Sequence, residues 1–389
     1  MTGTRRLLVL APFPPRLDAD HGGGRAVAQL LQLHAASNRV ALLALRRPGE
    51  RGVDGALAAA CEHVEVVENV PVGRSAGVAW RERGRALELA RGRPGWVASV
   101  TNSRYRQALV RLCAEWRPDI VQAELGVMAT YLPSVQDGTP RVLVEHDPGV
   151  RRAGAVWSRH AWRRFARAAT SSADAVVVFS DEDAAAERQV IAKTTLLERI
   201  PVPWPVPVRA LDPVGGLPPT VLFVGNFRHG PNREAARRLA RLLPEWQRRH
   251  PDVVLALVGD DPPRELERPG IAVPGRVDDL TPWLDDAAVV VAPLTEGGGV
   301  RVKVVEALAA GKAVVGTPRA FEGLSVEAGR DALVERDDAG FVAAVAGLLD
   351  DPLRRGALAA AARLWAEGLP SAASIAAAYD SLYARLEAG

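Results

Sequence analysis

Short apolar runs separated by helix-length segments recur along the chain, and this alternation constrains the fold more than any other feature of the sequence. Strands of a parallel sheet that is covered by helices on both faces have such continuous apolar runs. The first half contains six of them: Leu7–Ala11, Val40–Leu45, Val64–Val67, Ile120–Ala123, Val142–Val144 and Ala175–Phe179. Because crossovers between parallel strands are right-handed, the pattern predicts a doubly wound α/β sheet.

The same alternation restarts after a segment in the middle of the chain that is rich in proline. Residues 201–220 contain so many prolines and glycines that we expect an extended connector there, without helix or central strand. The second half has strand-like runs and helical patterns, and two alanine-rich helices are expected to close the chain. The strand-like runs are Val221–Gly225, Val253–Val258, Ile271–Val273, Val289–Ala292 and Ala313–Gly316, and the helical patterns are Arg233–His250, Leu280–Asp286 and Val302–Ala310.

The length of 389 residues exceeds the usual size of a domain with one hydrophobic core. We therefore predict an N-terminal Rossmann-like domain at 1–200, a linker at 201–220, a C-terminal Rossmann-like domain at 221–370 and a final helix at 371–389. One face of the final helix is apolar, so this helix must pack against the protein, and we expect it to pack on the N-terminal domain. The apolar residues of that face are Ile375, Tyr379, Leu382 and Leu386.

The charge balance and the cysteines bear on the partners and the compartment. The chain has 49 basic and 46 acidic residues, so its net charge of +3 gives little support for nucleic-acid binding, and we predict no nucleic-acid partner. Cys61 and Cys113 lack a metal-ligand spacing and are expected as reduced core thiols of a cytoplasmic protein. No stretch reaches the roughly 20 apolar residues of a transmembrane helix. Any membrane contact would therefore be peripheral, at the inner face of the membrane.

The strongest local motif lies between a strand-like run and a helical pattern in the second half. It consists of Gly297, Gly298 and Gly299, then Val300, Arg301, Lys303 and Glu306. Glycines permit close approach of a ligand to the backbone, and the first N–H groups of a helix favour phosphate. The arginine and the lysine add two cations beside this helix end, and the glutamate, one turn further, can accept two hydrogen bonds from a diol. The motif predicts a site for a diphosphate.

This motif resembles the C-terminal domain of glycosyltransferase family 4, in the branch with a Gly-Gly-Gly-x-Arg-x-Lys-x-x-Glu-Ala segment. The stretches Val221–Gly225, Leu255–Gly259 and Pro274–Leu280 fit the same family. The resemblance implies the GT-B fold, α/β with two Rossmann-like doubly wound domains that face a cleft. It also implies retaining transfer of a hexose from a nucleotide-diphosphate sugar to a glycan, lipid-linked or natural-product hydroxyl, with no cofactor besides this co-substrate and no bound metal.

The resemblance assigns roles residue by residue. Glu306 matches the glutamate that binds the nucleotide ribose. Gly298 stands where the family usually has a second glutamate, so we expect the backbone N–H groups of Gly298 and Gly299 to contact the donor sugar. In the family, the turn before the next helix touches the base, which gives this role to Arg276 and Val277.

Two differences from the family concern the diphosphate. Asn226 and Pro231 stand where many relatives have an arginine and a lysine. We keep Asn226 as a donor-binding candidate and expect Arg228, Arg301 and Lys303 to substitute for the missing cations.

The N-terminal half has two candidate sites. Gly22, Gly23 and Gly24 follow the first strand and precede a helix, as in the family's glycine loop under the donor phosphates, although a flexible surface loop is an open alternative. His146 follows the run Val142–Val144, at the edge where open α/β sheets bind ligands. In the family a histidine at this strand end lies beside the donor sugar. His146 is therefore the predicted catalytic residue, with a purely structural histidine as the alternative.

Several other interpretations remain open. Asp181-Glu182-Asp183 has an Asp-x-Asp spacing, but acidic residues directly before a helix cap it and complement its dipole, so we predict no metal site. A GT-B-shaped nucleotide-sugar epimerase or hydrolase, and a non-catalytic nucleotide-sugar-binding relative, are alternatives to a transferase. The helical pattern at 151–167 mixes arginines with aromatic residues, which fits either a membrane-surface helix or an ordinary surface helix.

Overall fold

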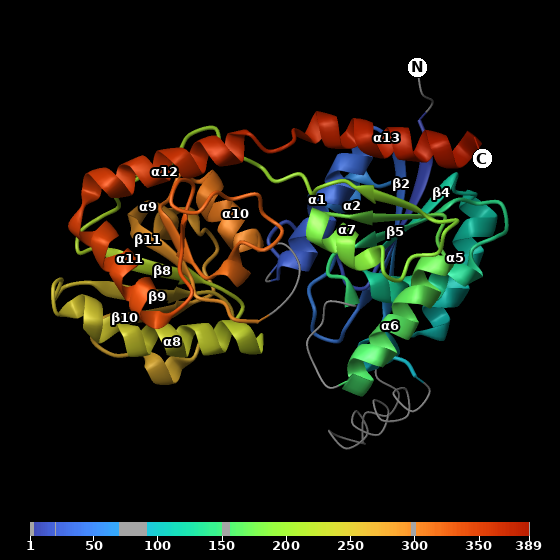
Figure 1. Cartoon of the computed structure of the whole chain (residues 1–389). Helices are drawn as coiled ribbons and strands as arrows, with labels where there is room; N and C mark the ends of the chain where they lie inside the picture. The colour runs from blue at the N-terminus through green and yellow to red at the C-terminus, as the bar shows by residue number, and fades with distance from the viewer. Residues whose placement is uncertain (1–3, 20, 70–91, 150–155, 297–300, 389) are drawn as a thin grey trace. The chain divides into compact units, whose positions relative to one another are not determined.

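The computed structural model describes residues 4–19, 21–69, 92–149, 156–296 and 301–388. The chain forms two compact units (Figure 1). Unit 1 comprises Met1–Ala19, Gly23–Pro203 and Pro370–Gly389, and unit 2 comprises Asp20–Gly22 and Trp204–Leu369.

Unit 1 contains a seven-stranded sheet with the order β3-β2-β1-β4-β5-β6-β7, and all neighbouring strands in its described part are parallel. Its strands are β1 (Arg6–Ala11), β2 (Arg39–Arg46), β3 (His63–Glu68), β4 (Ile120–Glu124), β5 (Arg141–Glu145), β6 (Ala175–Val178) and β7 (Leu196–Arg199). Its helices among the described residues are α1 (Gly22–Ala35), α2 (Gly55–Ala60), α4 (Gly95–Val100), α5 (Ser103–Trp116), η1 (Gly126–Ser134), α6 (Val156–Ser171), α7 (Asp181–Glu187) and α13 (Ala372–Ala388).

The strand order confirms the predicted doubly wound sheet. All six predicted strands of the first half are present, and the order changes direction between β1 and β4. The edge strand β7 lies outside the predicted runs. Its sequence, Leu-Leu-Glu-Arg, is partly exposed along its whole length and has no continuous apolar run, which is why the pattern misses it.

Unit 2 repeats this topology with a six-stranded sheet in the order β10-β9-β8-β11-β12-β13, and again all neighbouring strands are parallel. Its strands are β8 (Thr220–Val224), β9 (Val254–Val258), β10 (Ile271–Gly275), β11 (Ala287–Ala292), β12 (Val314–Gly316) and β13 (Leu333–Val334). Its helices are α8 (Gly230–Gln247), η3 (Arg264–Leu266), α9 (Thr281–Asp286), α10 (Val302–Ala309), η4 (Pro318–Ala320), α11 (Asp338–Asp350) and α12 (Pro352–Glu367).

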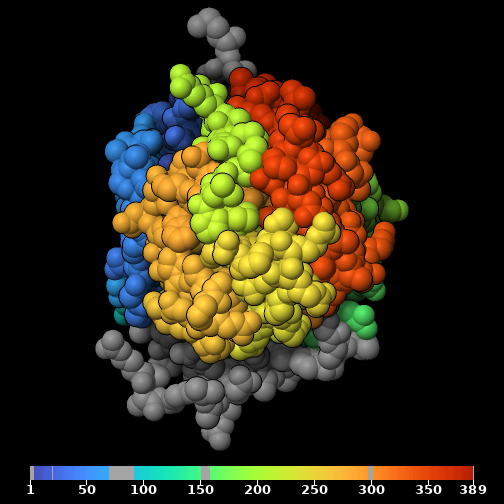
Figure 2. All heavy atoms as spheres, turned by 90° about the vertical axis from the view of Figure 1, so that its left-hand side faces the viewer, coloured from blue at the N-terminus to red at the C-terminus, as the bar shows by residue number. Residues whose placement is uncertain are grey.

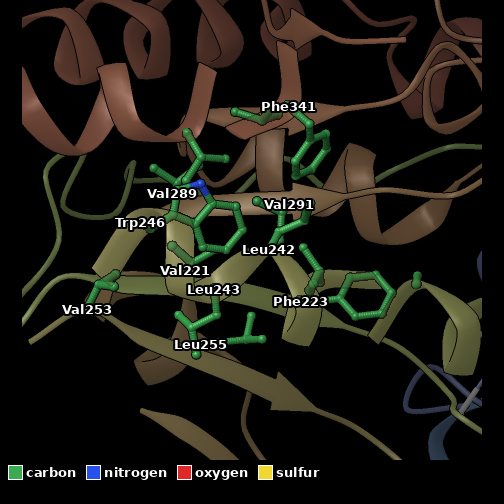
Figure 3. Packing of buried hydrophobic residues seen from close by; sticks show 14 of the residues in the cluster. Val221, Phe223, Leu242, Leu243, Trp246, Val253, Leu255, Val289, Val291 and Phe341 are labelled. Carbon is green, nitrogen blue, oxygen red and sulfur yellow. The ribbon is translucent and has the colours of Figure 1, made fainter. Parts of the chain in front are cut away.

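Apolar side chains from both faces of the unit 2 sheet form its core. On one face, Trp246 of α8 and Phe341 of α11 pack over valines and leucines of β8, β9 and β11 (Figure 3). The indole N–H of Trp246 donates a hydrogen bond to the carbonyl oxygen of Val342 at 3.3 Å, so its polar atom is satisfied inside the core. On the other face, α9, α10 and α12 contribute Leu284, Leu308 and Ala362 to a second cluster. Helices therefore cover both faces, as a buried parallel sheet requires.

The proline-rich segment that leads into unit 2 lies on the surface of that unit, between the parts coloured orange and red (Figure 2). Side chains of unit 2 donate hydrogen bonds to its carbonyl groups: Arg355 to Val214 at 2.9 Å, and Arg363 to Pro207 at 2.6 Å. The fully buried Lys312 donates to the carbonyl oxygen of Asp212. These bonds give the segment backbone partners, although its sequence forms neither helix nor strand.

Two helix predictions are wrong in detail. The chain closes with three helices, α11, α12 and α13, and not with the two that were predicted. Asp351 ends α11 and caps α12, so one alanine-rich region is divided into two helices. The long helix α8 begins at Gly230, three residues before the predicted start, because Pro231 fits the first turn of a helix. On α13 the buried side chains are Ile375, Tyr379, Leu382 and Tyr383, while Leu386 is half-buried.

Both cysteines are free thiols, but only Cys113 is buried in the core, whereas Cys61 is half-buried at the end of α2. Burial raises the pKa of each thiol to about 11, so both are protonated at neutral pH.

Candidate functional site

The carboxyl edge of the unit 2 sheet holds most of the predicted donor-binding residues. The strand order changes direction between β8 and β11, and ligands of such sheets bind outside the strand ends at this switch point. Asn226 and Arg228 follow β8 directly, whereas Arg301, Lys303 and Glu306 lie in or beside α10, the helix after β11. The two sets of residues therefore flank the switch point.

Glycines allow the strand ends to approach one another closely at this edge. Gly259 has a φ angle of 140°, and a Cβ atom placed on it would lie 2.0 Å from the carbonyl oxygen of Gly225. The N–H of Gly225 donates to the carbonyl oxygen of Val258, and the N–H of Gly259 donates to that of Gly275, both at 2.9 Å. A Cβ atom on Gly225 would lie 3.1 Å from Nζ of Lys303. The bare backbone thus makes room for the lysine.

Lys303 is fixed beside β8 by contacts with two side chains. Its Nζ atom donates to Oδ1 of Asn232 at 2.7 Å and lies 4.5 Å from the centre of the Phe223 ring. The attraction of an ammonium group to an aromatic face adds to the hydrogen bond. Asn232 in turn donates through Nδ2 to the carbonyl oxygen of Asn226 at 2.7 Å. Lys303, Asn232 and Asn226 therefore form one connected group at the switch point.

The two arginines at this edge differ in their surroundings. The Nε atom of Arg228 lies 3.1 Å from Oδ2 of Asp260, and the arginine side chain is 68% exposed. Ion pairs this exposed contribute little free energy, so Arg228 can change partners at low cost. The backbone N–H of Arg228 donates to Oδ1 of Asn226 at 2.9 Å, which fixes the turn after β8. Arg301 is half-buried, and its Nε atom donates to the carbonyl oxygen of Arg319 at 3.4 Å.

The remaining predicted residues of unit 2 differ in their exposure. Glu306 is half-buried on α10, one turn beyond Arg301 and Lys303. Arg276 is exposed after β10, whereas Val277 is half-buried and packs against a core cluster. Gly297, Gly298, Gly299 and Val300, which carry the strongest motif of the sequence, lie outside the described residues.

In unit 1, His146 lies directly after β5, at the predicted strand end, and is only 6% exposed. Its Nε2 atom is 2.7 Å from Oε2 of Glu124, the last residue of the neighbouring strand β4. The imidazole ring packs edge-on against Phe179 with 4.8 Å between the ring centres. The Nδ1 atom is buried and has no hydrogen-bond partner among the described residues.

Glu124 connects His146 to a chain of buried polar groups. Its Oε1 atom accepts a hydrogen bond from Nε2 of Gln122 at 2.7 Å. The same Gln122 nitrogen lies 3.1 Å from Nε2 of His34, and Oε1 of Gln122 accepts a hydrogen bond from the Tyr383 hydroxyl at 2.6 Å. Burial lowers the pKa of His34 to about 4, so this ring is neutral at physiological pH.

A pair of buried acids, Glu145 and Glu187, lies next to this network, because Glu145 directly precedes His146. Glu145 and Glu187 both line a cavity of about 10 Å³. The N–H of Gly126 donates to Oε1 of Glu145 at 3.2 Å, whereas Oε2 of Glu187 has no hydrogen-bond partner among the described residues. Burial, followed by the charge of Asp183, raises the pKa of Glu187 to about 7, and burial with the charge of Glu187 raises that of Glu145 well above its usual range.

The glycine segment of unit 1 is not a loop in front of a helix. The helix α1 begins at Gly22, so Gly23 and Gly24 form its first turn, and Gly24 is buried. Arg25 donates from Nε to the carbonyl oxygen of Ala19 at 2.8 Å. The alternative of a flexible surface loop is therefore wrong for these glycines.

The sequence analysis did not identify four functional candidates, namely Gln122, Glu124, Asn232 and Tyr383. A local pattern in the sequence could have indicated two of them, Gln122 and Glu124. The strand β4 reads Ile-Val-Gln-Ala-Glu, and all five residues are buried. Two polar residues with the two-residue period of a strand, inside a continuous buried strand, indicate a polar network on one face.

The Asp-x-Asp sequence lies at a helix start, but the cap is the preceding serine and not one of the acidic residues. Ser180 caps α7, its hydroxyl oxygen accepts from the N–H of Asp183, and Asp181, Glu182 and Asp183 form the first turn. In the part of the chain that the structure describes, no three histidine, cysteine, aspartate or glutamate side chains are grouped so that they could hold a metal ion. Within the same part, no helix combines the length and the hydropathy of a membrane span.

Parts of the sequence are similar to known transferases. Residues 218–351 match the family described as Glycosyl transferases group 1. Over 153 residues the chain is 38% identical to the phosphatidyl-myo-inositol mannosyltransferase of Mycolicibacterium smegmatis. This match covers 36% of this chain and 39% of that protein. The match thus spans about two fifths of the relative's length.

Solved structures match over nearly the whole chain. Sucrose-phosphate synthase from Thermosynechococcus elongatus has a TM-score of 0.73 and 18% identity, covering 99% of this chain and 100% of that one. Anabaena HepE, solved in complex with UDP and glucose, has a TM-score of 0.68 and 15% identity, covering 97% and 99%. At these identities the structures define the fold. The chain has the two Rossmann-like domains of GT-B glycosyltransferases, and its second domain contains a region similar to Glycosyl transferases group 1.

Proposed function

We propose that this chain is a glycosyltransferase that transfers a hexose from a nucleoside-diphosphate sugar to a hydroxyl acceptor. The observation that carries the proposal is the connected group of Lys303, Asn232 and Asn226 at the switch point of unit 2. This group lies within the region that matches Glycosyl transferases group 1. The name of the mannosyltransferase relative and the UDP and glucose bound to HepE agree with such a donor.

The proposal assigns a part of the donor to each candidate residue of unit 2. Lys303, Arg301 and Arg228 neutralise the diphosphate, together with backbone N–H groups of Gly297–Val300 and the side chain of Asn226. Glu306 accepts hydrogen bonds from the ribose hydroxyls, and Arg276 and Val277 contact the base. This division follows from the charges, because the cations flank the switch point while Glu306 lies one turn further along α10.

The proposed chemistry is retaining and needs no metal. As the sugar–phosphate bond breaks, negative charge develops on the leaving diphosphate, and fixed cations stabilise this charge. The departing phosphate takes the proton of the acceptor hydroxyl. From unit 1, we assign the first turn of α1, with Gly23 and Gly24, to the donor phosphates or the acceptor, and His146 to a hydroxyl group of the reacting sugars.

The acceptor we propose is a glycan, a lipid-linked glycan or a small hydroxylated natural product, and a membrane-bound acceptor would explain one surface of unit 1. His160, Arg163, Arg164 and Arg167 of α6 line a groove. They form no ion pair with the described residues, and such a cationic surface attracts anionic lipid. Flotation with vesicles of phosphatidylglycerol tests this part: binding that salt abolishes supports it, and no binding removes it.

The central experiment is a thermal-shift screen with uridine, guanosine, adenosine and thymidine diphosphates and their hexose conjugates. A ligand that binds only the folded protein raises the melting temperature. The donor that gives the largest shift is then incubated with acceptors, and the anomeric configuration of the product is read by proton NMR. Retention supports the mechanism, and inversion contradicts it.

Three outcomes would replace the proposal. Donor conversion at full rate without acceptor would indicate an epimerase or a hydrolase. Donor binding without turnover on a broad acceptor panel would indicate a non-catalytic binding protein. No thermal shift with any nucleotide or conjugate would remove the donor site itself.

A further inference from the structure

The buried chain that ends at His146 begins on the last helix of the protein. Tyr383 of α13, Gln122 and Glu124 of β4, and His146 after β5 are linked by three hydrogen bonds of 2.6, 2.7 and 2.7 Å. Tyr383 and Gln122 are fully buried, and Glu124 is 1% exposed. The helix α13 lies along unit 1 (Figure 1), where Tyr379 packs against His34 of α1 with 4.7 Å between ring centres.

The chemistry of these groups sets the direction of each hydrogen bond. The Tyr383 hydroxyl donates to Oε1 of Gln122, so the amide nitrogen of Gln122 must face Glu124 and His34. His34 is neutral because burial lowers its pKa to about 4, so its Nε2 atom can accept this hydrogen bond. The amide therefore donates to both neighbours, and its orientation is defined by three partners.

The carboxylate of Glu124 receives the next hydrogen bond. Each of its two oxygens faces one nitrogen, Gln122 Nε2 and His146 Nε2. A carboxylate oxygen only accepts hydrogen bonds, so both facing nitrogens are the donors in these two contacts. The proton between Glu124 and His146 then belongs to Nε2 of His146, and in a neutral imidazole the Nδ1 atom carries the lone pair. This Nδ1 atom is buried and makes no hydrogen bond to the described residues.

We infer that Glu124 and Tyr383 are positioning residues that hold His146 with a bare Nδ1 atom, ready to accept a hydrogen bond from a hydroxyl group of the ligand. The inference rests on the proposed function, because a polyhydroxylated sugar supplies such a hydroxyl. It also gives the last helix of the chain a role in the reaction besides packing. A phosphate oxygen is excluded as the partner of this nitrogen, because both atoms only accept.

The direct test is spectroscopic and needs no activity. The chain has seven histidines, and protein labelled with [¹⁵N]histidine reports the tautomer of each ring through its two nitrogen shifts. The His146→Gln variant identifies the signals of His146. We expect protonated Nε2 and bare Nδ1 in the wild type, and the opposite tautomer in Glu124→Gln, whose amide nitrogen would donate to Nε2. A wild-type ring with protonated Nδ1 overturns the inference, even if transferase activity is found.

The kinetic test separates positioning from packing. We expect Glu124→Gln to lower kcat on the order of 100-fold or more, as a wrong tautomer does in hydrolytic triads, while KM for the donor changes less than about 3-fold. Tyr383→Phe should lower kcat about 10-fold, because only one hydrogen bond of the chain is lost.

Tyr379→Phe is the matched control, since Tyr379 is a buried tyrosine of the same helix whose hydroxyl has no hydrogen-bond partner among the described residues. Its kcat should equal that of the wild type. Equal kcat in Tyr383→Phe and Tyr379→Phe, or a Glu124→Gln variant that keeps both the wild-type tautomer and the wild-type kcat, contradicts the inference. If no variant or wild-type protein transfers sugar, the proposed function fails, and the spectra still decide the tautomer.

Discussion

Nζ of Lys303 lies 2.7 Å from Oδ1 of Asn232, which places the only cation of α10 against the first turn of α8. The two helices follow β11 and β8, the strands that flank the switch point of unit 2. The hydrogen bond therefore holds a positive charge at the edge where open α/β sheets bind their ligands.

Lys303→Ala should weaken binding of the donor diphosphate by about 10-fold or more, because it removes a charge-assisted contact at the switch point. Isothermal titration calorimetry with the nucleoside diphosphate found in the thermal-shift screen measures the change. Lys193→Ala is the control, since Lys193 is exposed on unit 1 and should bind as the wild type does. Equal affinity of both variants would show that Lys303 does not contact the phosphates.

Glu306→Gln should separate recognition of the ribose from recognition of the diphosphate. Glutamine keeps the size of the side chain but loses the charge that strengthens hydrogen bonds to a diol. We expect the affinity for the nucleoside diphosphate to fall about 10-fold, while inorganic pyrophosphate, which lacks ribose, binds as to the wild type. A parallel loss for both ligands would mean that Glu306 acts on the fold or the phosphate site.

Gly259→Ala should destabilise unit 2 and impair the site together. The new Cβ atom would lie 2.0 Å from the carbonyl oxygen of Gly225, so the two strand ends must separate. We expect a loss of about 3 kcal/mol or more in the free energy of unfolding, with weaker nucleotide binding, because Gly225 adjoins Lys303.

Gly329→Ala is the matched control for this change. Gly329 also has a positive φ, of 84°, but a Cβ atom there meets no atom within 4 Å. Only backbone strain remains, so the expected loss is about 1 kcal/mol, with unchanged nucleotide affinity. Chemical denaturation compares the two variants, and losses of equal size would rule out the strand-end contact as the cause.

Glu187→Gln should change how the stability of the protein depends on pH. The pKa of Glu187 is raised from 4.5 to about 7 in the folded protein, chiefly by burial. Below about pH 4.5 Glu187 is protonated in both the folded and the unfolded protein, and its contribution to the free energy of unfolding is fully present. As the pH rises towards about 7, the unfolded chain loses the proton first, so the wild type loses stability on the order of 2 kcal/mol. The glutamine variant stays neutral and should not show this loss.

Urea denaturation from about pH 5 to about pH 8 measures the difference. Glu182→Gln changes an exposed glutamate of the same helix, α7, and should follow the wild-type curve. If Glu187→Gln also follows it, the Glu187 carboxyl group is not held protonated by its surroundings.

Local patterns in the sequence were sufficient to locate most of the sheet. The runs of β1, β2 and β6 are apolar because these strands are buried on both faces, and burial selects side chains without reference to distant residues. The same reasoning placed His146 at a strand end and the cations Arg301 and Lys303 near the start of a helix. The strand β7 lacks this signal because half-exposed edge residues need not be apolar.

Contacts between distant residues were decided only by the tertiary structure. Glu124 meets His146 because β4 and β5 are neighbours in the sheet, and Gln122 meets Tyr383 across 261 residues because α13 returns to unit 1. Lys303 likewise meets Asn232 across 71 residues, since β8 and β11 are paired. The period of a strand or helix determines which face a residue occupies. Strand order and the return path of the chain determine what that face meets, and both depend on packing free energy summed over the whole fold.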